Sequence, residues 1–472
     1  MNKKANPSQE KAINFKDGAC LVLSGPGSGK TFVLTNRVLT LIAKYKVNPS
    51  SILVITFTKA AANEMEERFS KLANEFFLND INKPNFGTFH SIFFDILREG
   101  FDYKYDSAIK KSDANNFLTS IINDKLKLNL SKETISSILK DISLYKLSKE
   151  SGEEFTPRFL SISKFLKVYK EFDKLMFDKK KLGFSDMIGM CQKLLLENKE
   201  VLKYYQKKYK YILIDEFQDI NKSQYEIIKL IAKSKNIFVV GDDDQSIYAF
   251  RGSSPGIMKV FLKDYRSAKV INLDINYRSV DNIVRHSRKL IERNIDRFDK
   301  DLVANNKNIG KFTVKGFIDS RDENKYIINC IQQYIKSGIS LDEIAILYRT
   351  NVLPYAIISD LNKANIPFNL KDNKKSINED IKTTCKNKIS LMTFHMSKGL
   401  EYKVVFIIDA NDGIVPHKKS IKSCDIETER RLFYVAMTRA KTDLHILFTI
   451  RRFGKNFKAS RFILEAIGEE YE

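Results

Sequence analysis

Short apolar runs recur along the first 275 residues, and most are rich in β-branched side chains. They cover residues 21–23, 52–57, 211–214, 237–240 and 270–273, and each ends in a small or polar residue. Patterns of helical period separate several of them. Apolar strands that alternate with helices are typical of a parallel sheet covered on both faces. We therefore predict an α/β domain in this half.

The second half of the chain repeats the same alternation. Its apolar runs cover residues 312–317, 344–348, 389–394, 404–408 and 444–448. The simplest organisation is two α/β domains of nucleotide-binding type, each built on a parallel sheet. The fold class that we predict is therefore α/β.

Two segments depart from this alternation. Residues 100–181 are rich in Lys, Leu, Ser and Ile at helical spacing without strand-like runs, which predicts a helical insertion into the first domain. Residues 372–388 are polar and charged, which indicates a loop or short linker. The first domain is then expected to comprise residues 1–99 and 182–274, and the second to comprise 275–371 and 389–472.

Composition bears on partners and compartment. The 472 residues include 80 Lys and Arg against 58 Asp and Glu, a formal net charge of +22. Such a charge favours a polyanionic partner, although a Lys-rich composition inherited from an AT-rich genome would give the same balance. The cysteines fit neither a zinc site nor a disulfide framework. With no secretory signal and no apolar run of spanning length, we expect a cytoplasmic protein without a membrane partner.

The strongest chemical signal is SGPGSGKT at residues 24–31. It follows an apolar run and opens a helical pattern, which is the context of a phosphate-binding P-loop. The backbone expected to wrap the phosphates of ATP belongs to Gly25, Gly27, Ser28 and Gly29. Lys30 is expected to reach the β- and γ-phosphates, and the Thr31 hydroxyl to bind Mg²⁺. Ser24 is a mild departure, because the strict pattern has glycine there.

Two further predicted strands end in polar residues. In YILIDEFQD, residues 211–219, Asp215 is expected to hold Mg²⁺ and Glu216 to polarise the attacking water. In VGDDDQSIYAFRGS, residues 240–253, the amide of Gln245 can report whether a γ-phosphate is present. The aromatic residues beside Arg251 in this segment have two readings, base stacking or ordinary core packing.

These segments, in this order, resemble the UvrD/Rep/PcrA family of superfamily 1 DNA helicases. The resemblance extends to GTFHS at 87–91, NYRS at 276–279, TFHMSKGLEY at 393–402 and ERRLFYVAMTRAK at 429–441, and it covers almost the whole chain. It implies two RecA-like P-loop NTPase domains with a helical insertion in the first, and ATP and Mg²⁺ as cofactors. It also implies an ATP-driven motor that moves 3′ to 5′ along single-stranded DNA.

The same resemblance assigns roles to individual residues. It implies a nucleoside site made of Gln9 on the adenine, Arg37 and Tyr277 around it, and Glu401 on the ribose. Arg278 and Arg439 would approach the γ-phosphate from the second domain, where guanidinium groups stabilise the charge that develops in phosphoryl transfer. The residues implied to contact the single strand are Phe57, Phe89, His90, Tyr248, Phe250, Arg251 and His395.

Two departures from the family keep alternatives open. Phe250 stands where the family usually has tryptophan, and residues 372–388 stand where it carries a large helical subdomain called 2B. The smaller Phe250 ring implies a weaker base contact. The short linker favours the alternative that the chain is a nucleic-acid-stimulated motor subunit of a repair or anti-phage defence complex, with a partner such as a nuclease. RNA stays open as the track, because no residue here selects against a 2′-hydroxyl. A non-enzymatic binding module is disfavoured by the intact ATP-site residues.

Overall fold

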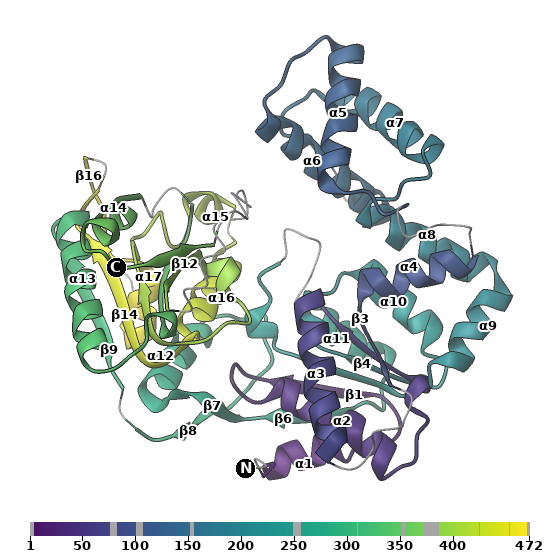
Figure 1. Cartoon of the computed structure of the whole chain (residues 1–472), viewed down its shortest axis with the longest axis horizontal. Coiled ribbons are helices and arrows are strands. Elements are labelled where there is room, and N and C mark those ends of the chain that lie inside the picture. Colours follow the sequence, from purple (N-terminus) through teal and green to yellow (C-terminus); the bar gives the residue numbers. More distant parts are fainter. Residues whose placement is uncertain are drawn as a thin grey trace.

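The computed structural model shows two lobes, each built around a six-stranded sheet, with a helical unit that projects from one of them (Figure 1). It describes the chain except for residues 1–3, 76–82, 101–106, 152–154, 249–255, 309, 352–354, 372–386, 424, 453 and 470–472.

The first sheet has the strand order β3-β2-β4-β5-β1-β6, and every pairing in it is parallel. Its strands are β1 (Cys20–Ser24), β2 (Ile52–Thr56), β3 (Asn85–Thr88), β4 (Tyr211–Ile214), β5 (Ile237–Gly241) and β6 (Lys269–Leu273). Successive residues of a strand point to opposite faces, so Leu21 and Leu23 join one core and Cys20 and Val22 the other. Apolar residues at every position are therefore what a sheet with two covered faces requires.

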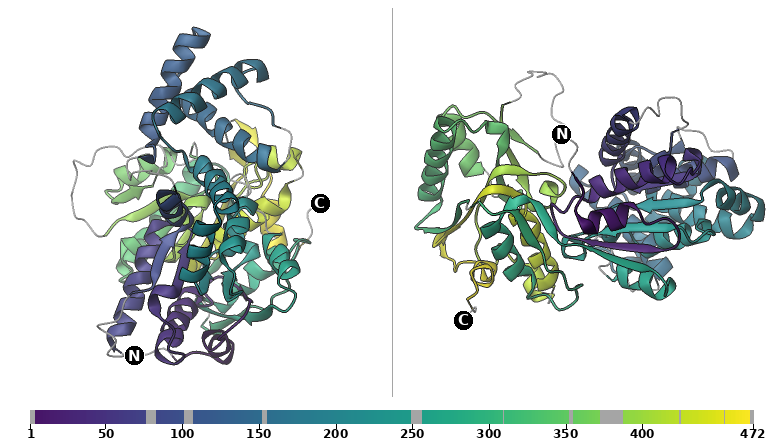
Figure 2. Two further views of the ribbon diagram at one scale, coloured as in Figure 1. Left: turned by 90° about the vertical axis from the view of Figure 1, so that its right-hand side faces the viewer. Right: turned by 90° about the horizontal axis from the view of Figure 1, so that it is seen from below.

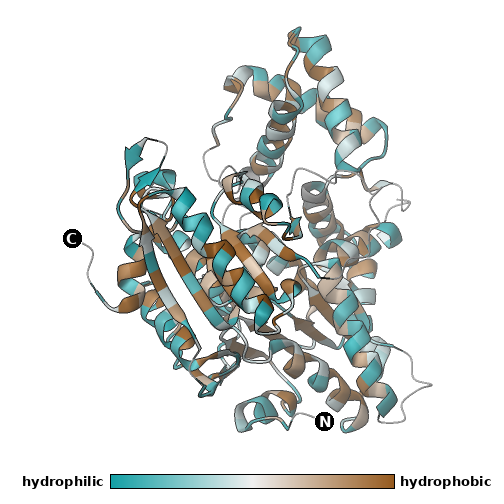
Figure 3. Cartoon of the chain, turned by 60° about the vertical axis from the view of Figure 1, so that its left-hand side comes forward, coloured by the Kyte–Doolittle hydropathy of each residue, from teal (hydrophilic) through white to brown (hydrophobic). Residues whose placement is uncertain are grey.

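Helices cover both faces of this sheet. One face is covered by α1 (Pro7–Ile13), α2 (Lys30–Ala43) and α3 (Lys59–Glu75). The other is covered by α4 (Phe89–Gly100), α8 (Phe184–Glu197), α9 (Lys199–Lys208), α10 (Lys222–Ile231) and α11 (Ile257–Asp264). Figure 3 shows this layering as hydrophobic strands inside and hydrophilic outer helix surfaces.

The second sheet repeats the arrangement with the order β11-β12-β10-β13-β14-β9, again with parallel pairings throughout. Its strands are β9 (Phe312–Phe317), β10 (Ile344–Tyr348), β11 (Phe368–Leu370), β12 (Ile389–Thr393), β13 (Tyr402–Ile407) and β14 (Ala440–Thr449). One face is covered by α12 (Asp281–Ile291), α16 (Ile426–Met437) and α17 (Arg461–Ile467). The other is covered by α13 (Ser320–Lys336) and α14 (Tyr355–Lys363).

A separate two-stranded parallel sheet joins the lobes. It pairs β7 (Ile275–Val280), which follows the last strand of the first sheet, with β8 (Val303–Asn306). Beyond the second sheet, α15 (Lys418–Lys422) precedes α16, and β15 (Arg451–Arg452) pairs with β16 (Lys455–Asn456). The β7–β8 pair matters for function because it lies against the P-loop, as described below.

The insertion contains α5 (Lys111–Leu126), α6 (Lys132–Ser151) and α7 (Ile162–Asp178), which share a core of their own. Figure 2 shows these helices extending away from both sheets. The chain enters and leaves the insertion side by side, because Ala108 and Leu182 form a parallel β-bridge. The N–H of Ile109 donates to the carbonyl oxygen of Leu182 at 3.0 Å.

The predicted fold class is confirmed. The ten predicted strands are all present, with ends that shift by up to four residues, and β3, β7, β8, β11, β15 and β16 are additional. Both β3 and β11 are edge strands and are only partly buried, so they lack the continuous apolar run that marks a central strand. Within the described ranges, no helix combines the length and apolarity needed to cross a lipid bilayer.

Candidate nucleotide and nucleic-acid site

Three neighbouring strands of the first sheet end at the same edge, each in a polar segment. The P-loop follows β1, Asp215 and Glu216 follow β4, and Asp242 to Gln245 follow β5. Since β4, β5 and β1 are adjacent in the sheet, their carboxyl ends converge. This edge is where ligands bind in open α/β sheets.

The P-loop conformation depends on glycine. Gly27 and Gly29 have φ values of 69° and 88°, which side chains with a Cβ rarely adopt. Gly29 directly precedes α2 and provides no side-chain cap, so the first amides of the helix are available to an anion. Ser24, where the strict pattern has glycine, is fully buried and its hydroxyl donates to the carbonyl oxygen of Gly241 at 2.9 Å. The serine therefore ties the start of the loop to β5.

Lys30 and Glu216 form an ion pair at the base of the loop, with 3.1 Å between Nζ and Oε1. Burial opposes the charge of Glu216, but Lys30 and Lys398 outweigh it and lower the pKa of that carboxyl. Burial and the adjacent Glu216 raise the pKa of Asp215. Glu216 sits at φ 50°, and this left-handed conformation turns the chain sharply after β4. The two neighbouring acids therefore have different environments, as their predicted roles require.

Gln218 connects this pair to the next strand, and the sequence analysis did not single it out. Its side-chain amide donates to Oε2 of Glu216 at 2.5 Å, and its carbonyl oxygen accepts from the backbone N–H of Asp242 at 2.9 Å. The residue is fully buried. The available signal in the sequence was an amide two residues after the acidic pair that ends an apolar run, because a polar group close to a core requires partners.

The second domain reaches this edge through Arg439, which follows α16. Arg439 is 1% exposed, and its Nη2 lies 3.3 Å from Oε1 of Gln245. Burial lowers the pKa of Arg439 to about 9. Lys398, a further residue that the sequence analysis missed, donates from Nζ to Oδ2 of Asp219 at 2.5 Å and to the backbone oxygen of Gln245 at 2.7 Å. Two cations of the second domain therefore contact the first.

Arg278 also comes from the second half and lies directly against the P-loop. A Cβ added to Gly27 would be only 2.6 Å from Cβ of Arg278, so glycine is what allows this approach. The guanidinium of Arg278 donates from Nε to Glu401 at 2.7 Å, and Lys441 lies 2.8 Å from the same carboxylate. Burial opposes ionisation of Glu401, but these cations lower its pKa to about 2. The carboxylate predicted to bind ribose is thus occupied by two cations here.

Gln9 and Tyr277 lie beside the P-loop. The amide of Gln9 donates to the carbonyl oxygen of Ser28 at 3.0 Å, and its oxygen accepts from the backbone of Asn6 at 3.1 Å. Tyr277 accepts from Asn6 Nδ2 at 2.8 Å, and its backbone N–H donates to Gly27 at 2.9 Å. Gln9 and Tyr277 therefore stabilise the P-loop through hydrogen bonds, and the ring of Tyr277 remains partly exposed.

The prediction that Arg37 stacks on adenine is wrong. Its guanidinium packs against the rings of Phe15 and Phe238, at 5.3 and 4.2 Å from their centroids, and the residue is 1% exposed. The side chain is therefore buried inside the first domain and is not available to a nucleoside. Phe32, the residue after Thr31, is partly exposed in the first turn of α2, and its Cβ lies 3.8 Å from the position that a Cβ on Gly29 would take. The sequence contained a signal for Phe32, because it directly follows the P-loop motif and only the first turn of the helix lies beside the loop.

The residues predicted to contact the single strand divide into three groups. Phe57, directly after β2, stacks on Tyr248 with 5.3 Å between centroids, and Lys398 Nζ lies 5.1 Å from the Tyr248 ring. These rings are partly exposed, as are His90 and His395. The prediction for Phe89 is wrong, because its side chain is 2% exposed and packs on Phe93 in the core. Phe250 and Arg251 lie outside the described residues.

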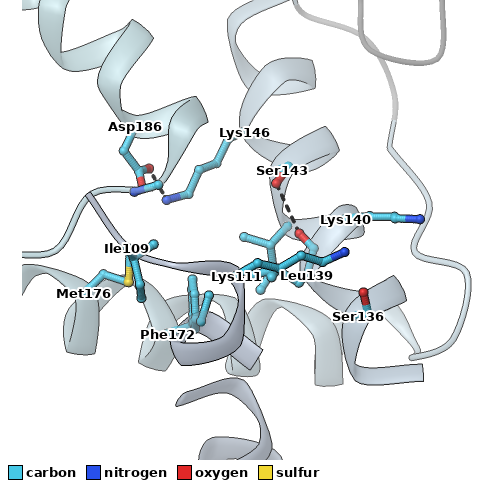
Figure 4. A pocket seen from close by; sticks show the side chains of 13 residues that line it. Ile109, Lys111, Ser136, Leu139, Lys140, Ser143, Lys146, Phe172, Met176 and Asp186 are labelled. Carbon is cyan, nitrogen blue, oxygen red and sulfur yellow. Dashed lines mark hydrogen bonds and ion pairs between the residues drawn. The ribbon is translucent and has the colours of Figure 1, made fainter. Parts of the chain in front are cut away.

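A separate cavity of about 240 Å³ lies in the insertion, away from the converging strand ends (Figure 4). Its lining is mostly apolar, with Phe172 and Met176 from α7. Its most buried charge, Lys146, is already paired with Asp186, and 2.7 Å separate its Nζ from Oδ1 of Asp173. Because Asp186 belongs to α8, the Lys146–Asp186 pair fastens the insertion to the first domain, whereas the Lys146–Asp173 pair joins two helices of the insertion. The cavity is a feature of this attachment and takes no part in the nucleotide site.

The fold and the strand-end residues define a P-loop protein with two RecA-like domains. The family model of the UvrD/REP helicase N-terminal domain matches residues 5–266, and that of the UvrD-like helicase C-terminal domain matches residues 271–378 and 374–451. The chain belongs to the UvrD-like helicase family.

Relatives with established names support this assignment. The chain is 28% identical to the ATP-dependent DNA helicase Rep of Buchnera aphidicola over an alignment of 648 positions, covering 98% of each protein. It is 34% identical to the ATP-dependent DNA helicase PcrA of Staphylococcus epidermidis over 384 positions, covering 79% of this chain and 51% of that protein. Because the Rep alignment is longer than the 472 residues here, Rep carries segments that have no counterpart in this chain.

Proposed function

We propose that the protein is an ATP-driven translocase on single-stranded DNA that acts as a DNA helicase. The observation that carries the proposal is the contact of Arg439 with Gln245, which joins the second domain to the strand ends that hold Lys30 and Glu216. A γ-phosphate bound there would be read by both domains at once. Hydrolysis would then change the force between the domains, which is how an ATPase performs mechanical work.

The residues at the site fit ATP and a divalent cation. Asp215 is a buried carboxylate at the end of β4, and Thr31 supplies a hydroxyl in the first turn of α2. Hard cations such as Mg²⁺ prefer such oxygen donors. We assign these two residues to the metal, which when bound would neutralise charge on the phosphates. The uncapped N-terminus of α2 and the Lys30 ammonium suit the phosphates themselves.

The ion pair between Lys30 and Glu216 gives the site a way to respond to ATP. While the two side chains are 3.1 Å apart, Lys30 keeps Glu216 ionised and weakly basic. Phosphates would compete for the Lys30 ammonium and so raise the basicity of Glu216, which could then accept a proton from the attacking water. Arg278 and Arg439 would stabilise charge on the transferring phosphoryl group.

A grip on DNA would come from the stacked rings of Phe57 and Tyr248 and from the adjacent Lys398. Tyr248 lies three residues after Gln245, so one segment connects the γ-phosphate sensor to the aromatic surface. Stacking on bases accepts any sequence, as a motor that moves along DNA requires. The family resemblance favours 3′-to-5′ movement.

A second candidate is a motor subunit that unwinds DNA only within a larger complex. The extra segments in Rep favour it, because this chain has a short predicted linker at residues 372–388 where the family carries 2B. Under this proposal ATP hydrolysis and translocation remain, and a protein partner supplies the grip on the duplex. Such a complex would fit either DNA repair or anti-phage defence. In both cases we propose Mg²⁺ as the cofactor and the cytoplasm as the location.

Unwinding assays distinguish the two candidates. Purified protein would be given ATP and fluorescent duplexes that carry either a 3′ or a 5′ single-stranded tail. Separation of the 3′-tailed duplex, without separation of the 5′-tailed duplex, supports an autonomous 3′-to-5′ helicase. Hydrolysis stimulated by the tail without strand separation supports the motor-subunit proposal. A matched duplex with an RNA tail tests the choice of track.

A further inference from the structure

Residues 294–300, called the strap here, lie between the two domains after α12. On one side the strap is held by α16 of the second domain: Arg430 donates to Oδ1 of Asn294 at 2.6 Å, and Arg431 donates to the carbonyl oxygen of Asp296 at 2.7 Å. On the other side it contacts the segment that follows β5 in the first domain. The strap therefore links the helix preceding Arg439 to the segment containing Gln245.

The contact with the first domain is a buried charge network. The Lys300 ammonium lies 2.6 Å from Oδ1 of Asp242, 2.6 Å from Oδ1 of Asp243 and 2.8 Å from Oδ2 of Asp244. Arg297 adds a two-pronged contact to Asp244, at 3.0 and 2.8 Å. All three aspartates are at most 1% exposed. Burial opposes the charge of Lys300, but the three carboxylates raise its pKa well above the ordinary value.

This arrangement explains a cluster that otherwise looks like a cation site. The three carboxylates place one oxygen each within 4.8 Å of one another, and buried carboxylates this close repel unless a cation is shared between them. The Lys300 ammonium supplies that cation. The network is thus a structural contact between Lys300 and the three aspartates. Its distances are shorter than the 3.3 Å between Gln245 and Arg439.

The network also determines how Gln245 is oriented. Asp242 accepts from Lys300 through Oδ1 and from the side-chain amide of Gln245 through Oδ2, at 2.6 and 2.5 Å. A carboxylate only accepts hydrogen bonds, so the NH₂ group of Gln245 must face Asp242. Its carbonyl oxygen then faces Arg439. Without Lys300, Asp242 would lose the cation that fixes it, and the amide of Gln245 would lose its fixed partner.

The geometry points to Lys300 as a positioning residue that couples ATP hydrolysis to the second domain by orienting Gln245 through Asp242. This inference rests on the proposed function, because it takes Gln245 to be the sensor of the γ-phosphate. Lys300 itself would touch neither ATP nor DNA. Movement of α16 would be passed through the strap to Asp242, and from there to the sensor.

A double-mutant cycle tests the inference. DNA-stimulated ATP hydrolysis would be measured for wild type, Lys300→Met, Gln245→Ala and the double variant, with the exposed Lys307→Met as matched control. We expect Lys300→Met to lower kcat about tenfold, a coupling typical of residues in one network, with KM for ATP unchanged. The double variant should be no slower than Gln245→Ala alone. Additive losses in the double variant would overturn the positioning role.

A charge-balanced variant covers the case in which Lys300→Met does not fold. Lys300→Met with Asp243→Asn removes one ammonium and one carboxylate, so it relieves the uncompensated buried charge. The expected result is a folded protein, by circular dichroism, with the same loss of kcat. Wild-type kcat in this folded variant would contradict the inference. If Gln245→Ala itself keeps wild-type kcat, the sensor role in the proposed function fails first, and the inference fails with it.

Discussion

Arg439 of the second domain and Gln245 of the first meet with 3.3 Å between Nη2 and Oε1, and both side chains are buried. Arg439 also donates to the carbonyl oxygens of Val435 and Leu400 and to the Thr438 hydroxyl, which hold the guanidinium in the second domain. A fixed arginine opposite a fixed amide gives the interface a definite geometry. The contact is therefore well placed to respond to a γ-phosphate.

Replacement of Arg439 should abolish catalysis without abolishing DNA binding. For Arg439→Ala we expect kcat for DNA-stimulated ATP hydrolysis to fall by roughly 10³–10⁵, the effect of an arginine that stabilises the phosphoryl-transfer transition state. Affinity for oligo-dT, measured by fluorescence anisotropy, should change little. Arg68→Ala is the matched control, because Arg68 is exposed and pairs with Glu64 of its own helix. A kcat within threefold of wild type would show that Arg439 has no catalytic role.

The nucleoside site should depend on Phe32 and not on Arg37. Phe32→Ala removes a partly exposed ring beside the P-loop, and we expect KM for ATP to rise about tenfold if that ring stacks on adenine. Arg37→Met should leave KM unchanged, because the guanidinium is buried against Phe15 and Phe238 inside the first domain. Steady-state ATPase assays measure both. An increase in KM for Arg37→Met in a folded protein would restore the rejected role.

The stack of Phe57 and Tyr248 should govern affinity for single strands. Tyr248→Ala is expected to weaken binding to oligo-dT by about 1–3 kcal/mol, the usual loss for one base-stacking side chain. Tyr204→Ala is the control, because Tyr204 is exposed on α9 and contacts Tyr205 of its own helix. Titrations at fixed salt concentration measure both variants. Equal affinities of the two variants would contradict a DNA-binding role for the stack.

The second domain should lose stability in mild acid because of His445. The ring is buried against Phe406, and its two nitrogens form hydrogen bonds with the hydroxyls of Tyr326 and Tyr334. Burial lowers the pKa of His445 to about 4. Between pH 6.5 and about 4 the unfolded chain binds a proton that the folded chain does not. The free energy of unfolding should therefore fall as pH falls through this window, by on the order of 3 kcal/mol.

Urea unfolding at several pH values, followed by circular dichroism, measures this effect. His445→Gln removes the titrating group, so its stability should vary less with pH between 4 and 6.5 than that of wild type. Carboxylates titrate in the same range in both proteins, so the difference between the two pH profiles gives the contribution of the histidine. Parallel profiles would contradict the assignment.

Central strands and the P-loop could be predicted from sequence because one local pattern determines each. An apolar run such as that of β1 is recognisable without knowing its neighbours, and Gly27, Gly29 and Lys30 form one contiguous motif. The edge strand β3 could not be recognised, because within the described part of the chain only one of its sides pairs with a strand, and its residues are only partly buried. Its sequence NFGT has no continuous apolar character.

Residues that act through long-range contacts were harder to predict. Lys398 and Lys300 lie 153 and 55 residues from Gln245, and no local pattern indicates that they converge on its segment. Arg37 and Phe89 failed for the opposite reason. Both lie in or next to recognisable motifs, but the turn of the helix directs their side chains into the core.

The central claim, that this protein hydrolyses ATP to move along single-stranded DNA, is tested most directly by ATP hydrolysis with and without oligo-dT. Wild type, Lys30→Ala and the exposed-lysine control Lys44→Ala would be compared at equal concentration. We expect strong stimulation of wild type and Lys44→Ala by oligo-dT, and loss of hydrolysis in Lys30→Ala because the ammonium no longer binds the phosphates. Hydrolysis that oligo-dT does not stimulate, or that persists in Lys30→Ala, would contradict the claim.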